Sequence, residues 1–226
     1  MDFSYPHNDT SLPERPSRTG NINKLVAHPL VKGIRADAFV RRIPVSSDET
    51  LQFVCVQARA CGAENILEIG AAVGASGIAL LQTCPQAHLT TIEKNADFAA
   101  EAQANFGRAG LSDRVKLLCG DAADILPRLG GQFDFIFLDG PKVQYVKWLP
   151  HLKRLLRSGG MLAADDVLLY GWVNGEVPAP QKRHMLVEHV REYLDAVMGD
   201  GDFLSYVADV GDGIALSVKI KDTNES

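Results

Sequence analysis

The stretch ILEIGAAVGASG, residues 66–77, joins an apolar run to a glycine-containing turn and then to a segment with helical spacing. Such an order is typical of the first strand-turn-helix unit of a parallel sheet. Gly70 and Gly74 lack side chains, so a ligand can approach the backbone and the N-terminus of the helix there. A tight turn that binds nothing is the alternative. The stretch predicts an α/β fold with a candidate binding site at the carboxyl ends of its strands.

Outward from this unit, β-type runs alternate with helix-length segments. We expect seven strands, at residues 65–70, 88–93, 114–120, 133–140, 160–166, 203–210 and 213–220. Segments long enough for crossover helices separate the first five strands, at 75–84, 95–109, 121–129 and 143–157. The last two strands are joined through Gly211, Asp212 and Gly213, which is typical of a tight hairpin. The pattern predicts a Rossmann-like, seven-stranded, mostly parallel, doubly wound sheet with a C-terminal antiparallel hairpin.

Length and composition indicate one folded domain preceded by a tail. A chain of 226 residues with 46% hydrophobic content can bury one sizeable core. Residues 1–20 are polar and proline-rich, which predicts a flexible tail, and 21–221 form the expected single domain. Within 21–43 we expect short helical pieces interrupted by Pro29 and Gly33. No signal peptide and no apolar stretch of about 18 residues is present, so we expect no membrane contact and a cytoplasmic location.

The net charge and the spacing of the cysteines exclude some classes of protein. A net charge of −5 and a pI near 5.7 argue against a protein that coats polyanions, although a local basic patch is compatible with one structured nucleic acid. Cys55, Cys61, Cys84 and Cys119 show no CxxC spacing and lie in apolar stretches. We therefore expect reduced, structural thiols.

Two acids follow the second and third expected strands. Glu93 ends the second strand, and Asp121 follows the third in the stretch CGDAAD. A carboxylate at the end of the second strand can accept both hydrogen bonds of a ribose diol. Glu93 as a solvated strand end and Asp121 as the N-cap of the next helix are the alternatives. Because both acids share a sheet edge with Gly70, a nucleoside site is favoured.

Three more acids lie at the carboxyl ends of the fourth and fifth strands. Asp139 ends the apolar run FDFIFLD, and Asp165 with Asp166 ends GMLAADD. Adjacent strand residues point to opposite faces, so we expect the strand to end near Asp165 and both acids to turn toward Asp139. Three clustered carboxylates repel unless a cation or protons neutralise them. They predict a divalent metal site; the alternative is a turn cap at Asp139, with the other two acids facing solvent.

The ordered set of motifs resembles the cation-dependent O-methyltransferases that use S-adenosylmethionine, the group of the catechol and caffeoyl-CoA enzymes. The set spans roughly 44–219 and comprises ExGxxxG at 68–74, Glu93, GDA at 120–122, LDGPKVQY at 138–145, DDVLLYG at 165–171 and VGDGIALS at 210–217. The closest likeness is to the bacterial branch that methylates 5-hydroxyuridine in tRNA. Members of that branch share the GDG hairpin and a basic stretch, which here contains Lys182, Arg183 and His184.

The resemblance implies roles for individual residues. Asp139, Asp165 and Asp166 match the metal ligands, and Lys142 matches the proposed general base. Cofactor contacts are implied for Ser46, Glu68, Gly70, Gly74, Ser76, Glu93, Asp121, Ala122 and Asp139. Two departures stand out: Asp166 replaces the usual Asn, and Gly140 and Pro141 replace the usual small pair before Lys142. The extra charge of Asp166 should tighten a divalent ion or alter its preference.

The implied reaction is methyl transfer from S-adenosylmethionine to a hydroxyl oxygen, with Mg²⁺ as the expected cation and a homodimer as the expected assembly. The acceptor stays open between 5-hydroxyuridine in tRNA and a small catechol-type molecule, since both offer two neighbouring oxygens. The tRNA interpretation also uses Lys182, Arg183, Arg191, Arg41 and Arg42, any of which can be ordinary surface charge.

Two other classes are weighed against this one. An NAD(P)-dependent oxidoreductase is partly compatible with Gly70 and Glu93, but Ala72 and Ala75 stand where the GxGxxG motif requires glycine. A binding module without catalysis would need neither Lys142 nor the acid cluster. Both alternatives are disfavoured by the acids at the strand ends.

Overall fold

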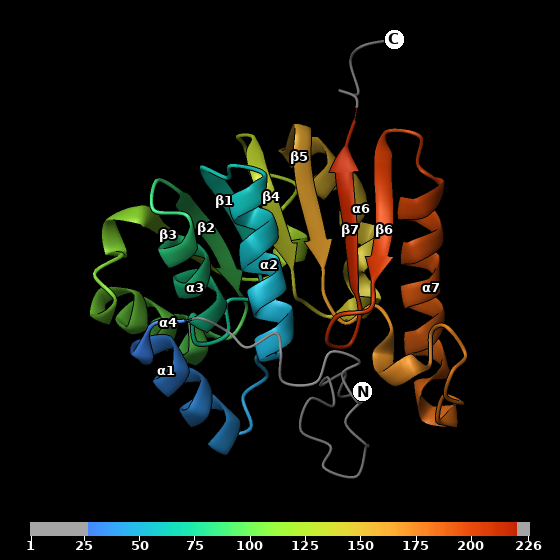
Figure 1. Cartoon of the computed structure of the whole chain (residues 1–226), viewed down its shortest axis with the longest axis horizontal. Helices are drawn as coiled ribbons and strands as arrows, with labels where there is room; N and C mark the ends of the chain where they lie inside the picture. The colour runs from blue at the N-terminus through green and yellow to red at the C-terminus, as the bar shows by residue number, and fades with distance from the viewer. Residues whose placement is uncertain (1–26, 221–226) are drawn as a thin grey trace.

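The computed structural model describes residues 27–220, so the expected tail at 1–20 lies outside the described part. Seven strands form one sheet in the order β3-β2-β1-β4-β5-β7-β6 (Figure 1). Their bounds are β1 Asn65–Ile69, β2 His88–Glu93, β3 Val115–Cys119, β4 Phe133–Leu138, β5 Leu156–Ala164, β6 Phe203–Ala208 and β7 Ile214–Lys219. β1 to β5 pair in parallel, whereas β7 is antiparallel to both β5 and β6. The predicted fold and its C-terminal hairpin are confirmed.

Helices cover both faces of the sheet. The helices are α1 Pro29–Val40, α2 Asp48–Ala60, α3 Ala75–Thr83, α4 Ala96–Arg108, α5 Ala122–Ile125, α6 Tyr145–Leu155 and α7 His184–Gly199. α1 to α4 pack on one face with Ile66 of β1, and α5 to α7 pack on the other with Leu67. Consecutive strand residues therefore enter opposite cores, which explains why the central strands read as continuous apolar runs.

Short 3₁₀ turns complete the connections. They are η1 Ser112–Arg114, η2 Lys142–Gln144, η3 Leu169–Gly171 and η4 Gln181–Arg183. η2 follows β4, η3 follows β5, and η4 comes directly before α7. The first two therefore lie at the carboxyl ends of the strands, where the acids were expected.

Three boundaries differ from the sequence expectation. Residues 29–40 form one helix rather than interrupted pieces, because Pro29 occupies its first turn, where no backbone N–H is needed. Gly33 lies inside this helix, and burial of Val31 and Ile34 offsets its weak helix propensity. β5 begins at Leu156, before the expected start, with a register irregularity opposite Phe133 and Phe135. The helix after β3 ends at Ile125 rather than near 129.

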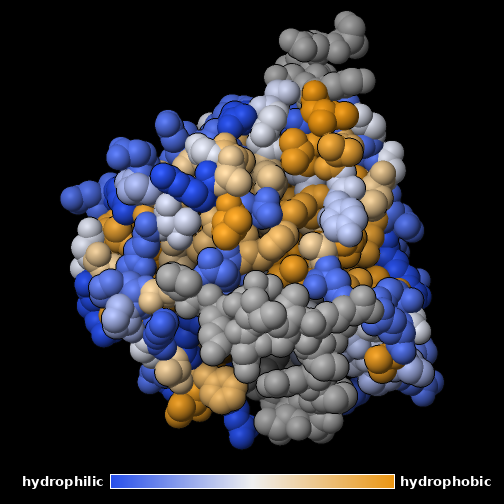
Figure 2. Space-filling view, in the orientation of Figure 1, coloured by the Kyte–Doolittle hydropathy of each residue, from blue (hydrophilic) through white to orange (hydrophobic). Residues whose placement is uncertain are grey.

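One part of the sheet has an open face. In the part of the chain that the structure describes, no helix covers the front of β7 and β6, and apolar side chains gather there in Figure 2. Leu204 and Tyr206 of the edge strand β6 are 68% and 71% exposed. Among residues 27–220, no helix combines the length and apolar character needed to cross a membrane.

The carboxyl ends of β1 and β4 approach each other closely. Gly70, at the end of β1, has φ +103°, and a Cβ atom there would lie 2.1 Å from the carbonyl oxygen of Asp139. No residue with a side chain fits at that distance, so glycine is required where the backbone after β1 approaches the backbone after β4. This contact fixes the turn that begins at Asp139 against the turn after β1.

Candidate active site

A cavity of about 710 Å³ opens at the carboxyl ends of the parallel strands. Many of the residues singled out from the sequence line it: Ser46, Gly70, Ser76, Glu93, Asp121, Ala122, Asp139 and Lys142. Glu68, Gly74, Asp165 and Asp166 do not belong to this lining. The cavity is large enough for a nucleoside cofactor together with a small second molecule.

The turn after β1 forms one end of the cavity. Glu68 is fully buried beneath it and accepts hydrogen bonds from Ser76 Oγ (2.5 Å) and Thr91 Oγ1 (2.6 Å). Gly74 is the N-cap of α3 and packs against Ala102 of α4. Burial raises the pKa of Glu68 to about 7, although the two hydroxyl donors act in the opposite direction. Glu68 thus supports the turn from below instead of facing the cavity.

The two acids expected to contact a nucleoside are held by the backbone. Glu93 accepts from the backbone N–H of Ala72 (2.8 Å) and of Asn95 (2.7 Å), one bond on each carboxylate oxygen. Each oxygen keeps a further lone pair for a ligand. Asp121 is the N-cap of α5, accepts from Ala123 N and pairs with Lys94 at 2.7 Å. The capping alternative for Asp121 is therefore correct, and the residue lines the cavity as well.

The three acids after β4 and β5 form a cluster that we term the acidic triad: Asp139, Asp165 and Asp166. One carboxylate oxygen of each lies within 4.8 Å of those of the others. β5 ends at Ala164, and Asp166 has φ +58°, in the left-handed region, which turns its side chain toward the same place. Asp165 and Asp166 are 1% and 4% exposed. The strand thus ends where expected, and the two neighbouring acids converge.

Lys142 points into the acidic triad. Its Nζ lies 2.8 Å from Asp166 Oδ2 and 3.1 Å from Asp139 Oδ1, and the residue is 3% exposed. Ser46 Oγ donates to the other oxygen of Asp139 at 3.0 Å. With all three carboxylates ionised, they and the one ammonium leave two negative charges in excess, which matches a divalent cation.

The pKa values follow from this arrangement. Burial and the carboxylates of Asp166 and Asp139 raise the pKa of Asp165 well above its ordinary value. Burial by itself lowers the pKa of Lys142, but the carboxylates, Asp166 foremost, outweigh it and hold that pKa well above its ordinary value. Lys142 is therefore a cation in this structure. Buried, clustered oxygen donors whose negative charge exceeds that of the nearby cation fit a hard divalent ion.

Two supporting contacts were not foreseen from the sequence. Tyr145 donates from its buried hydroxyl to the carbonyl oxygens of Leu138 (3.0 Å) and Asp165 (3.4 Å), so it ties the ends of β4 and β5 together. The motif LDGPKVQY contains this tyrosine, but only the paired strand ends reveal its partner groups.

The hairpin between β6 and β7 makes the second contact. The backbone oxygens of Asp212 and Gly213 accept from Leu168 N (2.9 Å) and Val167 N (3.0 Å), and the Asp212 side chain accepts from Tyr170 N. These bonds hold the turn that follows Asp166. The GDG sequence thus holds the backbone that follows Asp166 of the acidic triad, in addition to joining the last two strands of the sheet.

The basic residues considered for nucleic-acid contact have different surroundings. Arg41 pairs with Glu101 (2.7 Å) and Asp37 (2.8 Å), and Arg191 pairs with Glu188 (2.7 Å). Lys182 and Arg183 line the cavity. Of the five candidates, Arg41 and Arg191 are thus paired with acids, whereas Lys182 and Arg183 face the cavity.

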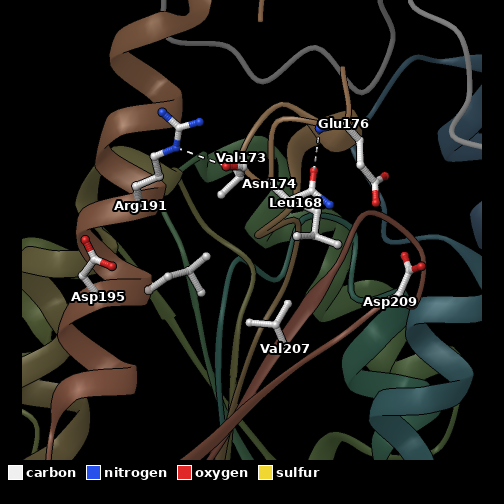
Figure 3. Close-up of a pocket in the computed structure, with 9 residues that line it drawn as sticks. Leu168, Val173, Asn174, Glu176, Arg191, Asp195, Val207 and Asp209 are labelled. Carbon is white, nitrogen blue, oxygen red and sulfur yellow. Dashed lines mark hydrogen bonds between the residues drawn. The ribbon is translucent and has the colours of Figure 1, made fainter. Parts of the chain in front are cut away.

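A second cleft of about 470 Å³ lies between α7 and β6 (Figure 3), and it shares no lining residue with the first cavity. Figure 3 shows Arg191 at its rim, where Nε donates to the carbonyl oxygen of Val173 at 3.1 Å. Asp195 and Asp209 face the cleft from α7 and from the segment after β6. No residue that we singled out for the reaction lines it, so the chemistry is assigned to the first cavity.

Comparison with known proteins agrees with this geometry. A family model described as O-methyltransferase matches residues 24–220. A catechol O-methyltransferase of Niastella koreensis is 38% identical over 154 residues, which cover 65% of this chain and 69% of that protein. A catechol O-methyltransferase of Mycobacterium tuberculosis is 36% identical over 156 residues, 66% and 70% of the two chains.

A solved structure adds the cofactor of a relative. The O-methyltransferase TomG of Streptomyces achromogenes, in complex with S-adenosylmethionine, superposes with a TM-score of 0.75 at 26% identity, over 87% of this chain and 92% of that one. The match of the family model over all of the described residues carries the assignment. The chain belongs to the O-methyltransferase family.

Proposed function

We propose that the protein transfers a methyl group from S-adenosylmethionine to one hydroxyl of a catechol-type acceptor, with a divalent cation held by Asp139, Asp165 and Asp166. The observation that carries this proposal is that Asp139 and Lys142 line the cavity that also contains Gly70 and Glu93, and that Asp165 and Asp166 have carboxylate oxygens within 4.8 Å of one on Asp139. Relatives named as catechol O-methyltransferases support the acceptor class.

The cofactor end of the cavity fits a nucleoside sulfonium. Gly70 leaves the backbone open, and Glu93 offers carboxylate oxygens of the kind that accept from a ribose diol. Asp121 and Ala122 line the same end, where an adenine would lie in the proposed arrangement. S-adenosylmethionine supplies an electrophilic methyl group, so the protein has to align an oxygen with it and exclude water.

The acceptor end fits a hydroxyl that must lose a proton. A bound divalent cation favours the ionised form of an oxygen that it contacts. Lys142 is the proposed base; in this structure it holds its proton at Nζ, and that proton has to leave before Lys142 accepts another. The carboxylates that raise the pKa of Lys142 are those proposed to hold the cation, so cation binding and release of this proton are expected to be linked.

The test is an acceptor panel with S-adenosylmethionine and Mg²⁺. We expect methyl transfer to catechols and none to phenols that lack the neighbouring hydroxyl. Asp139→Ala should lose at least about 100-fold in kcat, because an oxygen donor of the triad is removed. Asp113→Ala, an exposed acid in η1, is the control. Native rates in Asp139→Ala would refute the proposed site.

Transfer RNA is the competing acceptor. The resemblance to the 5-hydroxyuridine branch suggested it, but the relatives named above give it no support, and Arg41 and Arg191 are paired with acids. The panel therefore includes bulk tRNA. Methyl incorporation into tRNA, with no transfer to catechols, would replace the catechol proposal.

The homodimer stays a prediction drawn from the resemblance. Its test is the mass in solution, which should be twice the 24.5 kDa of one chain. A mass of one chain at micromolar concentration would contradict it.

A further inference from the structure

The start of α7 and the preceding η4 form one wall of the cavity. This wall supplies the side chains of Lys182, Arg183, Met185, Leu186 and His189. α7 also contacts η2, the turn after β4 that begins with Lys142. The wall therefore lies at the acceptor end rather than at the end where Glu93 is found.

The electrostatic surroundings of Tyr170 agree with this placement. Burial and the carboxylates of Asp212 and Asp166 raise the pKa of Tyr170 to about 12, whereas Lys142 and Arg183 act in the opposite direction. Arg183 and Asp166 thus act on the same phenol. The charge of Arg183 therefore acts on the phenol of Tyr170, which lies four residues after Asp166 in the chain.

Most charges that line the cavity have partners within the protein. Arg35 pairs with Asp48, and Lys94 pairs with Asp121. Lys142 is enclosed by the acidic triad. Within residues 27–220, by contrast, neither Lys182 nor Arg183 forms an ion pair or a side-chain hydrogen bond. Two cations without acidic partners at one end of a binding cavity favour an anionic ligand group.

Apolar side chains lie on the same wall and on the neighbouring turn η2. Met185 is 68% exposed although it lines the cavity, and Leu186 lies one residue further along α7. Pro141 and Val143 line the cavity from the turn that contains Lys142. An aromatic ring can pack against these groups while a charged substituent reaches the two cations.

We propose that Lys182 and Arg183 bind a carboxylate or phosphate substituent on the methyl acceptor, so that the preferred substrates are catechols with an anionic side chain. This inference rests on the proposed function, since it names the kind of acceptor for the same site. An anionic tail bound at this wall orients the ring, and that orientation selects which hydroxyl reaches the methyl group.

The experiment compares acceptors that differ in charge and little in shape. The probes are 3-(3,4-dihydroxyphenyl)propanoate, its methyl ester, the phosphate ester of 2-(3,4-dihydroxyphenyl)ethanol and the amine 2-(3,4-dihydroxyphenyl)ethylamine. We expect the carboxylate or the phosphate to exceed the neutral ester by about tenfold in kcat/KM, and the amine to be the poorest. The advantage should shrink as salt is raised, because the two cations are open to solvent.

The variant is the double charge reversal Lys182→Glu with Arg183→Glu. It should lower kcat/KM for the carboxylate and the phosphate far more than for the neutral ester, so that the preference for anionic acceptors of about tenfold disappears, since an uncharged tail makes no ion pair. Lys147→Glu, an exposed lysine of α6 outside the cavity lining, controls for net charge. Calorimetric binding of the carboxylate in the presence of S-adenosylhomocysteine gives a second readout, with Kd expected to rise about tenfold in the variant.

The outcomes separate the two proposals. Equal methylation of the carboxylate, phosphate and ester by the native protein would overturn the inference and leave the catechol function standing. An equal loss for the ester in the double variant would also overturn it, because the two residues would then act without regard to charge. If no catechol is methylated, or only tRNA is, the proposed function and the inference both fall.

Discussion

At the residue scale, the adjacent acids Asp165 and Asp166 show what the sequence can and cannot predict. Their place after an apolar run predicts a strand that ends in carboxylates, and the structure has that end at Ala164. The left-handed backbone of Asp166 and the insertion of Lys142 between Asp166 and Asp139 depend on contacts between distant segments. No local pattern contains that information.

Replacing Asp166 by Asn tests the unusual ligand. Asn tolerates the left-handed conformation and keeps one oxygen donor, so Asp166→Asn should retain activity within a few fold. It removes one negative charge, so the Kd for Mg²⁺ should rise about tenfold. A cation titration of the methyl-transfer rate measures both. Asp166→Ala is the matched variant without an oxygen donor and should be inactive. Loss of all activity in a folded Asp166→Asn protein would mean that the role of this acid is different.

The buried Glu68 makes a prediction about stability. Its pKa is raised to about 7 in the folded protein against 4.5 as the ordinary value, so the folded state binds the proton more tightly than the unfolded chain. The resulting stabilisation is complete below pH 4.5 and is lost as the pH rises to about 7, a change of about 3 kcal/mol in the free energy of unfolding. Glu68→Gln should remove this dependence, and denaturant unfolding between pH 4.5 and 8 measures it.

The comparison for Glu68 uses an exposed acid nearby. Glu64→Gln changes the same chemical group at the surface, just before β1, and should keep the pH dependence of the native protein. Parallel stability curves for the native protein and Glu68→Gln would show that the carboxyl at this position is not the titrating group.

At the element scale, the periodic segments were predictable and the connections were not. All seven strands and the hairpin follow from apolar runs and turn residues, because the central strands are buried on both faces and each turn needs specific backbone angles. α1 was expected to break at Gly33, but tertiary packing of its apolar face overrides local propensity. The hairpin loop was assigned to sheet closure, although its bonds also hold the turn after Asp166.

The hairpin is therefore expected to influence the metal site from outside it. Asp212→Ala removes the side-chain acceptor for Tyr170 N, in a turn where Leu169 and Tyr170 both have positive φ. The turn after Asp166 should loosen, and the Kd for Mg²⁺ should rise about tenfold, corresponding to about 1.4 kcal/mol. Asp212→Asn keeps the acceptor oxygen and should restore the native Kd. A native Kd in Asp212→Ala would show that the hairpin does not position the triad.

At the scale of the whole molecule, two segments far apart in sequence meet at one edge of the sheet. The turns after β1, β2 and β3 line the proposed cofactor end, and the turn after β4 with η4 and the start of α7 lines the proposed acceptor end. Parallel strand order alone predicted that the acids share an edge. It could not predict that η4 and α7 close the cavity, since this contact depends on how the helix packs.

The charge distribution of the whole molecule also bears on the acceptor. The protein has a net charge of −5, and the arginines Arg41 and Arg191 are paired with acids, while Lys182 and Arg183 are concentrated at the cavity. A long nucleic acid needs a broader run of cations than this. The arrangement suits a small acceptor with one charged group.

The cation requirement of the proposed reaction is tested by the rate of methyl transfer to a catechol before and after removal of divalent cations. We expect the rate to fall to background in excess chelator and to return when Mg²⁺ is restored, with Asp139→Ala showing no recovery. A chelator-treated native protein that still transfers methyl groups at its full rate would contradict a reaction that depends on a divalent cation.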